Sequence, residues 1–268
     1  MNIYTDMADE LFRPGRGTVP PGVQVRTASS GPIRLTRVQI TRQGLARPAG
    51  RYSTLEAPSL AALDRRDERL ISAAAAELRA MLPTVGLVLV VGVGNRRVTV
   101  DALGPRTAAG VLVTRGLAAD ARADGLGLRE VVCVSPGASG ATGIPLAQLL
   151  AGLVRTLKPA AIVCVDSLCT SDPARLGRTI QISDTGLSPA RPDSGRCITR
   201  AMLGVPVLAV GVPTLMEADE CVEGAKGLIL TCRQLDGVIR SGSELLSAAI
   251  NKALQPSLSI AELCYLAN

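Results

Sequence analysis

The fold is decided by residues 90–110, which read VVGVGNRRVTVDALGPRTAAG. An apolar run enters a glycine turn, a lone aspartate follows, and a helical pattern begins after it. A dinucleotide fingerprint needs G-x-G-x-x-G opening the helix directly and an acidic residue about 20 positions further on. Here GVGNRR lacks the third glycine, and RVTV separates the turn from the helix. The stretch therefore predicts a frame that holds the carboxylate of Asp101, and argues against a phosphate cradle.

The same alternation of strands and helices continues on both sides of this stretch. Strands are predicted at 85–94, 129–137, 160–168, 178–186, 205–214 and 227–231, and helices at 64–81, 101–118, 143–157 and 234–253. Short links between them predict an α/β fold, a mostly parallel sheet covered by helices on both faces. The runs GVQVRT and IRLTRVQIT, residues 22–27 and 33–41, predict an antiparallel hairpin as an N-terminal β elaboration.

We interpret residues 1–268 as one domain with three parts. Residues 1–58 form the leader and hairpin elaboration, residues 83–232 the core sheet, and residues 233–268 the C-terminal helices.

Composition restricts the chemistry. The chain is 47% apolar with no Trp and one Phe, so its core must be aliphatic. It contains no histidine, which excludes Ser-His and Cys-His nucleophile pairs and the commonest zinc ligand. Its seven cysteines show no CxxC spacing and are interpreted as reduced thiols. The sequence therefore predicts neither a metal nor a cofactor, and assigns acid–base work to carboxylates, Lys, Tyr or Cys.

Charge and targeting signals indicate an intracellular protein. The net charge is +6, and many arginines lie in residues 13–51, as a solvated surface or as a docking face for an acidic partner. No motif for direct nucleic-acid reading is present. No apolar run approaches the ~20 residues of a membrane span, and the polar start carries no export signal. We expect a cytoplasmic protein.

Two aspartates are the candidate catalytic residues. Asp166 directly follows the apolar strand IVCV, and Asp101 follows the glycine turn. In open α/β sheets, sites form beyond the carboxyl ends of the strands. If both side chains reach one crevice, one carboxyl can keep a proton that the other has lost, and the pair can activate a water. Alternatively, Asp101 is a helix N-cap and Asp166 only shapes a turn. A third acid, Asp184, can join the pair or shape a turn.

Five blocks of the chain, with its opening and its ending, carry a resemblance to the bacterial spore germination protease family. They are residues 90–117, 134–154, 158–168, 179–190 and 203–218. The resemblance implies an α/β core similar to that of hydrogenase maturation proteases, with Asp101 and Asp166 as the essential acids. Gly94 and Asn95, in the glycine turn before Asp101, are candidate supporting residues from their position in the sequence, as is Asp184. It also implies an endopeptidase of the small acid-soluble proteins that coat spore DNA, located in the forespore or spore core. A tetrameric zymogen that removes its own leader is a further implication.

The leader is expected to be cut between Asp6 and Met7, with cleavage after Glu10 as the alternative. Because MNIYTDMADELF is polar, we expect it to be weakly held. The chain departs from the family in the short segment ADECVEGAKG, which bears on oligomerisation and regulation, and in the turn GNRRVT. Two alternatives stay open: a metal-dependent maturation-type protease, and an inactive spore binding protein of the same fold.

Overall fold

The computed structural model describes residues 4–12, 18–62, 67–117, 127–137, 142–188, 197–222, 224–225 and 227–267. Within these residues the strands form one nine-stranded sheet in the order β1-β2-β3-β7-β8-β6-β4-β5, with β9 paired to β8. The strands are β1 Val23–Ser30, β2 Ile33–Ile40, β3 Gly50–Glu56, β4 Val88–Gly92, β5 Val131–Val134, β6 Ala161–Cys169, β7 Thr179–Ser183, β8 Val207–Glu217 and β9 Ile229–Thr231.

The centre of the sheet is parallel. Strands β5, β4, β6 and β8 run in the same direction, whereas β1, β2, β3, β7 and β9 join by antiparallel pairs. Every residue of β4 is buried, as expected for a parallel strand covered on both faces. Its side chains alternate, so that Val88 and Val90 enter one core cluster and Leu89 and Val91 the other.

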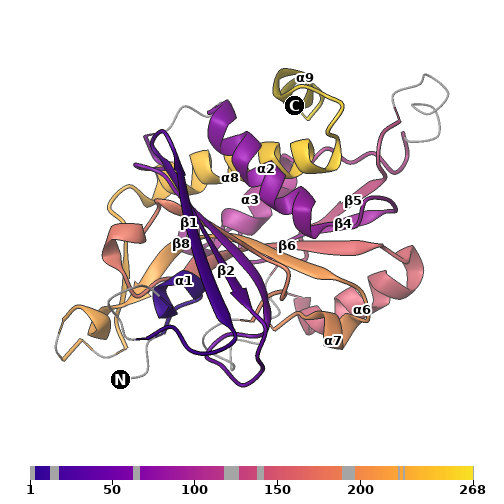
Figure 1. Cartoon of the computed structure of the whole chain (residues 1–268). Coiled ribbons are helices and arrows are strands. Elements are labelled where there is room, and N and C mark those ends of the chain that lie inside the picture. Colours follow the sequence, from indigo (N-terminus) through magenta and orange to yellow (C-terminus); the bar gives the residue numbers. More distant parts are fainter. Residues whose placement is uncertain are drawn as a thin grey trace.

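Helices cover both faces of the sheet and confirm the predicted α/β class (Figure 1). Helices α2, α3 and α8 lie on one face, and α6 and α7 on the other. The helices are α1 Ala8–Leu11, α2 Glu68–Met81, α3 Leu103–Ala109, α6 Leu146–Leu157, α7 Arg200–Leu203, α8 Leu235–Leu254 and α9 Ile260–Leu266. No helix among the described residues is long and apolar enough to cross a membrane.

Local sequence explains several of these boundaries. The side chain of Asp67 caps α2 by accepting hydrogen bonds from the backbone of Arg69 and Leu70. Helix α6 ends at Leu157, where its C-cap Lys158 adopts a left-handed conformation at φ 48° and Pro159 follows. Residues 64–66 and 118, which the predicted helices included, lie outside the described residues.

The structure corrects three expectations about local structure. The N-terminal elaboration has a third strand, β3, which pairs with β7 and so continues the core sheet. The helix predicted at 101–118 is shorter, because a 3-10 turn occupies Thr99–Asp101 and α3 ends at Ala109 before Gly110. The N-cap of α3 is Ala102, which makes no side-chain cap, so the N-cap interpretation of Asp101 is wrong.

Candidate active site

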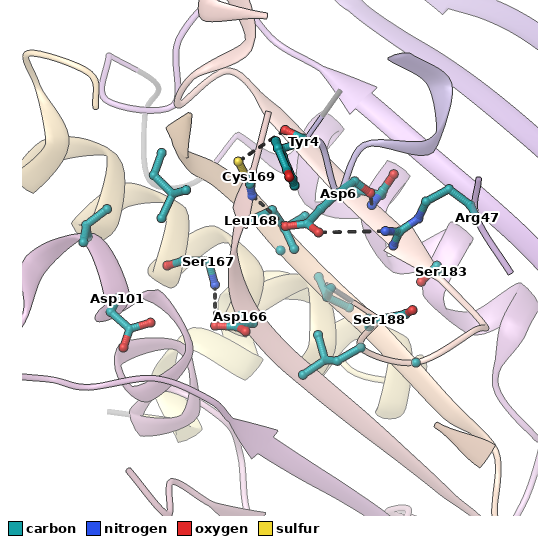
Figure 2. Close-up of a pocket in the computed structure, with 18 of the residues that line it drawn as sticks. Tyr4, Asp6, Arg47, Asp101, Asp166, Ser167, Leu168, Cys169, Ser183 and Ser188 are labelled. Carbon is teal, nitrogen blue, oxygen red and sulfur yellow. Dashed lines mark hydrogen bonds and ion pairs between the residues drawn. The ribbon is translucent and has the colours of Figure 1, made fainter. Parts of the chain in front are cut away.

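Asp101 and Asp166 line the same cavity, which has a volume of about 410 Å³ (Figure 2). Asp166 lies within β6, three residues before the strand ends at Cys169, and pairs with Gly211 of β8. The expectation that it follows the strand and the alternative that it shapes a turn are therefore both wrong. Asp101 is the last residue of the 3-10 turn that follows β4. Strands β4 and β6 are paired neighbours, with Gly92 opposite Val165. Their carboxyl ends therefore open at the same edge of the sheet, which is how residues 65 positions apart in sequence reach one crevice.

Glycines allow the close packing that brings Asp101 to this edge. A Cβ on Gly104, in α3, would lie 2.2 Å from the carbonyl oxygen of Val93 and 2.4 Å from that of Val165. Helix α3 thus lies directly against β4 and β6, and only glycine fits at that contact. The turn that precedes α3 is carried to the mouth of the cavity as a result.

The carboxylate of Asp101 is held by the glycine turn itself. The backbone N–H of Asn95 donates to Asp101 Oδ2 at 2.9 Å and to the Asp101 carbonyl at 3.1 Å. Gly94 has φ 119°, and a Cβ there would lie 2.2 Å from the Asp101 carbonyl oxygen. Gly94 and Asn95 therefore position Asp101, while both line a second cavity of about 380 Å³ with Arg96 and Arg97.

Asp166 is the more buried of the two acids. Its side chain belongs to a residue only 5% exposed, and Asp166 Oδ1 accepts a hydrogen bond from the Ser167 backbone at 2.8 Å. The neighbouring strand β8 contributes Ala209 and Gly211, small residues that leave open space beside the carboxylate. A Cβ on Gly211 would lie 2.4 Å from the Asp166 carbonyl oxygen.

Asp184 is placed apart from this pair. It is not among the described residues that line the cavity. Its Oδ1 accepts a hydrogen bond from the Arg51 backbone and its Oδ2 one from Arg51 Nε, both at 2.7 Å. Asp184 thus links the end of β7 to the start of β3.

The N-terminal segment enters the cavity, and the expectation that it is weakly held is wrong. Asp6 and Tyr4 line the cavity beside the two candidate acids. The Asp6 N–H donates to the Cys169 carbonyl at 2.9 Å, and the Cys169 N–H donates to Asp6 Oδ2 at 2.8 Å. Gln181 donates to the Asp6 carbonyl at 2.7 Å and accepts from the Ala8 N–H at 2.8 Å.

Polar contacts anchor the acidic residues that follow. Residues 5–10 are all buried. Arg175, only 3% exposed, binds both carboxylate oxygens of Asp9, and Glu10 accepts hydrogen bonds from Thr170 and Ser171. A polar segment is therefore buried here because its charges are paired and hydrogen-bonded, a possibility that its composition did not reveal.

Arg47, Cys169 and Gln181 are among the cavity residues that were missed from the sequence. Burial, with a smaller effect of Asp6, raises the pKa of the Cys169 thiol to about 12. Nothing in their local pattern distinguishes these residues, since an arginine in a loop and a glutamine in a strand usually face solvent. In the described part of the chain, no three Cys, Asp or Glu side chains gather as a metal site would require.

The family model and the sequence relatives of this chain carry the same description. A family model described as germination protease matches residues 16–227. The germination protease of Caldanaerobacter subterraneus subsp. tengcongensis is 33% identical, covering 98% of this chain and 97% of the relative. That of Clostridium tetani is 29% identical over 98% of both chains. The first alignment spans 316 positions against 268 residues here, so the relative carries residues that this chain lacks.

A distant structural likeness also exists. A nickel–iron hydrogenase maturation protease, HycI from Thermococcus kodakarensis, aligns with a TM-score of 0.39 and 16% identity, covering 65% of this chain and 98% of that one. With its family model matched over most of its length, the chain belongs to the germination protease family.

Proposed function

We propose that the protein is an endopeptidase that begins the degradation of small acid-soluble spore proteins during germination, with Asp101 and Asp166 as its catalytic pair. The observation that carries this proposal is that both acids line one cavity in a member of the germination protease family. The names of the relatives support a protease of spore germination. The family resemblance of the sequence blocks supports small acid-soluble spore proteins as the substrate.

The chemistry follows from two carboxyl groups at one cavity. One carboxylate accepts a proton from a water molecule while the water oxygen attacks the scissile carbonyl carbon. The other carboxyl, which carries a proton, donates it to the carbonyl oxygen as the tetrahedral intermediate forms. The first carboxyl then gives the proton that it took from water to the amine nitrogen as the C–N bond breaks, and the second recovers its proton from a hydroxyl of the intermediate as the new carboxyl product forms. Hydrogen bonds from Asn95 and Ser167 orient the two groups before the substrate arrives.

Self-processing of the leader is part of the proposal. Asp6 lines the same cavity as Asp101 and Asp166, which supports the bond between Asp6 and Met7 as the cleavage site. Glu10 is bound by Thr170 and Ser171, so cleavage after it is less favoured. A tetrameric assembly and a location in the spore core complete the proposal, both on the strength of the family resemblance.

The pair is tested by Asp101→Asn, Asp166→Asn and the double variant. We expect each single variant to fold and to cleave a purified acid-soluble spore protein several orders of magnitude more slowly. Residues that act as one unit give non-additive losses, so the double variant should be little slower than either single one. Near-normal turnover in either single variant contradicts the pair.

The same assay separates the alternatives. Activity that is lost to a chelator and restored by zinc or nickel favours the metal-dependent protease. A folded wild-type protein that binds the spore protein without cutting it favours the inactive binding protein. Intact-mass measurement of wild type and Asp166→Asn shows whether the leader is removed by the chain itself.

A further inference from the structure

Arg47 is a buried arginine with unused hydrogen-bonding capacity in the cavity of the two aspartates (Figure 2). It lies in the loop between β2 and β3 and is only 7% exposed. Its Nη1 is 3.9 Å from Asp6 Oδ1, beyond hydrogen-bond length. Among the described residues nothing accepts a hydrogen bond from its buried Nε. A buried guanidinium with an unsatisfied donor is costly, and such a group in a cavity points to a ligand.

Arg47 is also the sole basic residue among the described residues that line this cavity. The acids at the cavity are Asp6, Asp101, Asp166 and Glu217. Of the lining residues that the structure describes, these acids repel an incoming carboxylate and only Arg47 attracts it, so electrostatics favours a position beside Arg47. A planar guanidinium can also bind a carboxylate through two parallel hydrogen bonds.

The leader already shows how a peptide lies beside this arginine. Cys169 and Gln181 bind the backbone of residues 6–8 from two strands, β6 and β7. The Asp6 side chain lies between Cys169 and Arg47, where Figure 2 marks its contacts. Strands β6 and β7 thus hold the main chain of the leader, while the Asp6 side chain faces the guanidinium of Arg47.

We propose that Arg47 is the specificity residue that binds an acidic side chain of the substrate, at the position that Asp6 occupies in the present structure. By fixing that side chain, Arg47 sets the register of the peptide relative to Asp101 and Asp166. The inference rests on the proposed peptidase function. It adds Arg47, and the binding of an acidic side chain, to that function.

The first test needs no catalytic activity. Amide hydrogen exchange of Asp6 and Ala8 is measured in the full-length chain for wild type, Asp6→Asn, Arg47→Gln and the double variant. If Arg47 binds the carboxylate, each single change accelerates exchange and the double change adds little to either one. Additive effects overturn the proposal. Arg42→Gln, an exposed arginine of the same loop, is the matched control and should leave exchange unchanged.

The second test measures specificity. Peptides with the sequence of residues 4–11, carrying Asp, Asn or Lys in place of Asp6, compete for cleavage of an acid-soluble spore protein. The Asp peptide should inhibit about tenfold to a hundredfold better than the Asn peptide, the range for a hydrogen bond to a charged group. Arg47→Gln should abolish this ratio, and Arg47→Glu should favour the Lys peptide.

Each outcome decides a different statement. If the Asp peptide still inhibits Arg47→Gln better than the Asn peptide does, the proposed substrate subsite is wrong. This holds even when the exchange measurements show coupling between Asp6 and Arg47, because Arg47 then binds only the leader. A wild-type protein that never cleaves the spore protein overturns the proposed function. In that event the exchange cycle alone decides whether Arg47 binds the carboxylate.

Discussion

Gly94→Ala should damage the candidate site more than the fold. At φ 119° any side chain is strained, at a cost of about 1–2 kcal/mol. In addition, the new Cβ would lie 2.2 Å from the Asp101 carbonyl oxygen, and that oxygen belongs to rigid backbone. Relieving the overlap requires a shift of about 1 Å in the turn that carries Asp101, and a misplacement of that size can cost about a hundredfold in rate.

The assay compares kcat/KM for spore-protein cleavage with the free energy of unfolding in urea. The matched control is Gly204→Ala at the C-cap of α7, where φ is 76° but a Cβ meets nothing within 4 Å. Both variants should lose free energy of unfolding from backbone strain, Gly94→Ala the more because its Cβ also overlaps the Asp101 carbonyl oxygen, and only Gly94→Ala should lose activity. Wild-type activity in a folded Gly94→Ala protein would refute the argument that this turn positions Asp101.

Three other predictions concern charges and thiols. Arg175→Met leaves Asp9 buried without its partner and should cost about 3–5 kcal/mol in urea unfolding; a loss under about 1 kcal/mol contradicts the anchoring role. Burial alone would raise the pKa of Glu77, but hydrogen bonds from Arg37 and Ser53 outweigh it and hold the pKa below 4.5. The ionised Glu77 side chain stabilises the folded protein above the unfolded-state pKa, and this stabilisation is lost as pH falls through the folded-state pKa. Glu77→Gln should therefore be less stable than wild type at pH 7, and the difference should be much smaller at pH 3. Burial, and to a smaller extent the negative charge of Asp6, raises the pKa of the Cys169 thiol to about 12. The thiol is therefore protonated at pH 8, and iodoacetamide at that pH should leave cleavage activity intact. Rapid inactivation that Cys169→Ser prevents contradicts this prediction.

Much of the core could be predicted from local patterns. Continuous apolar runs identified β4 and β6, because a strand buried on both faces needs apolar side chains at every position. The same logic placed Asp101 after β4, as the structure has it, but it placed Asp166 after its strand, whereas Asp166 lies within β6, because the strand continues through Cys169 where β8 pairs with it. The roles of the two acids stay a prediction, although their shared cavity is now described.

The local sequence predicted the structure less well for segments whose conformation depends on contacts with distant residues. Strand β3 was not predicted, because its burial depends on pairing with β7, more than 120 residues further on. The leader appeared too polar to be held, yet Asp6 pairs with Cys169 across 163 residues of sequence. Polar burial depends on partners, and partners are brought together only by the completed fold.

The sequence by itself therefore determined the α/β class and the order of most strands and helices, and indicated Asp101 and Asp166 as candidate acids, because periodicity and position relative to an apolar run are local properties of the chain. Tertiary structure alone decided that the leader lies in the cavity, that Gly94 and Gly104 carry Asp101 to its edge, and that Arg47 faces Asp6 there. These depend on distances between segments far apart in the chain, which no local pattern encodes.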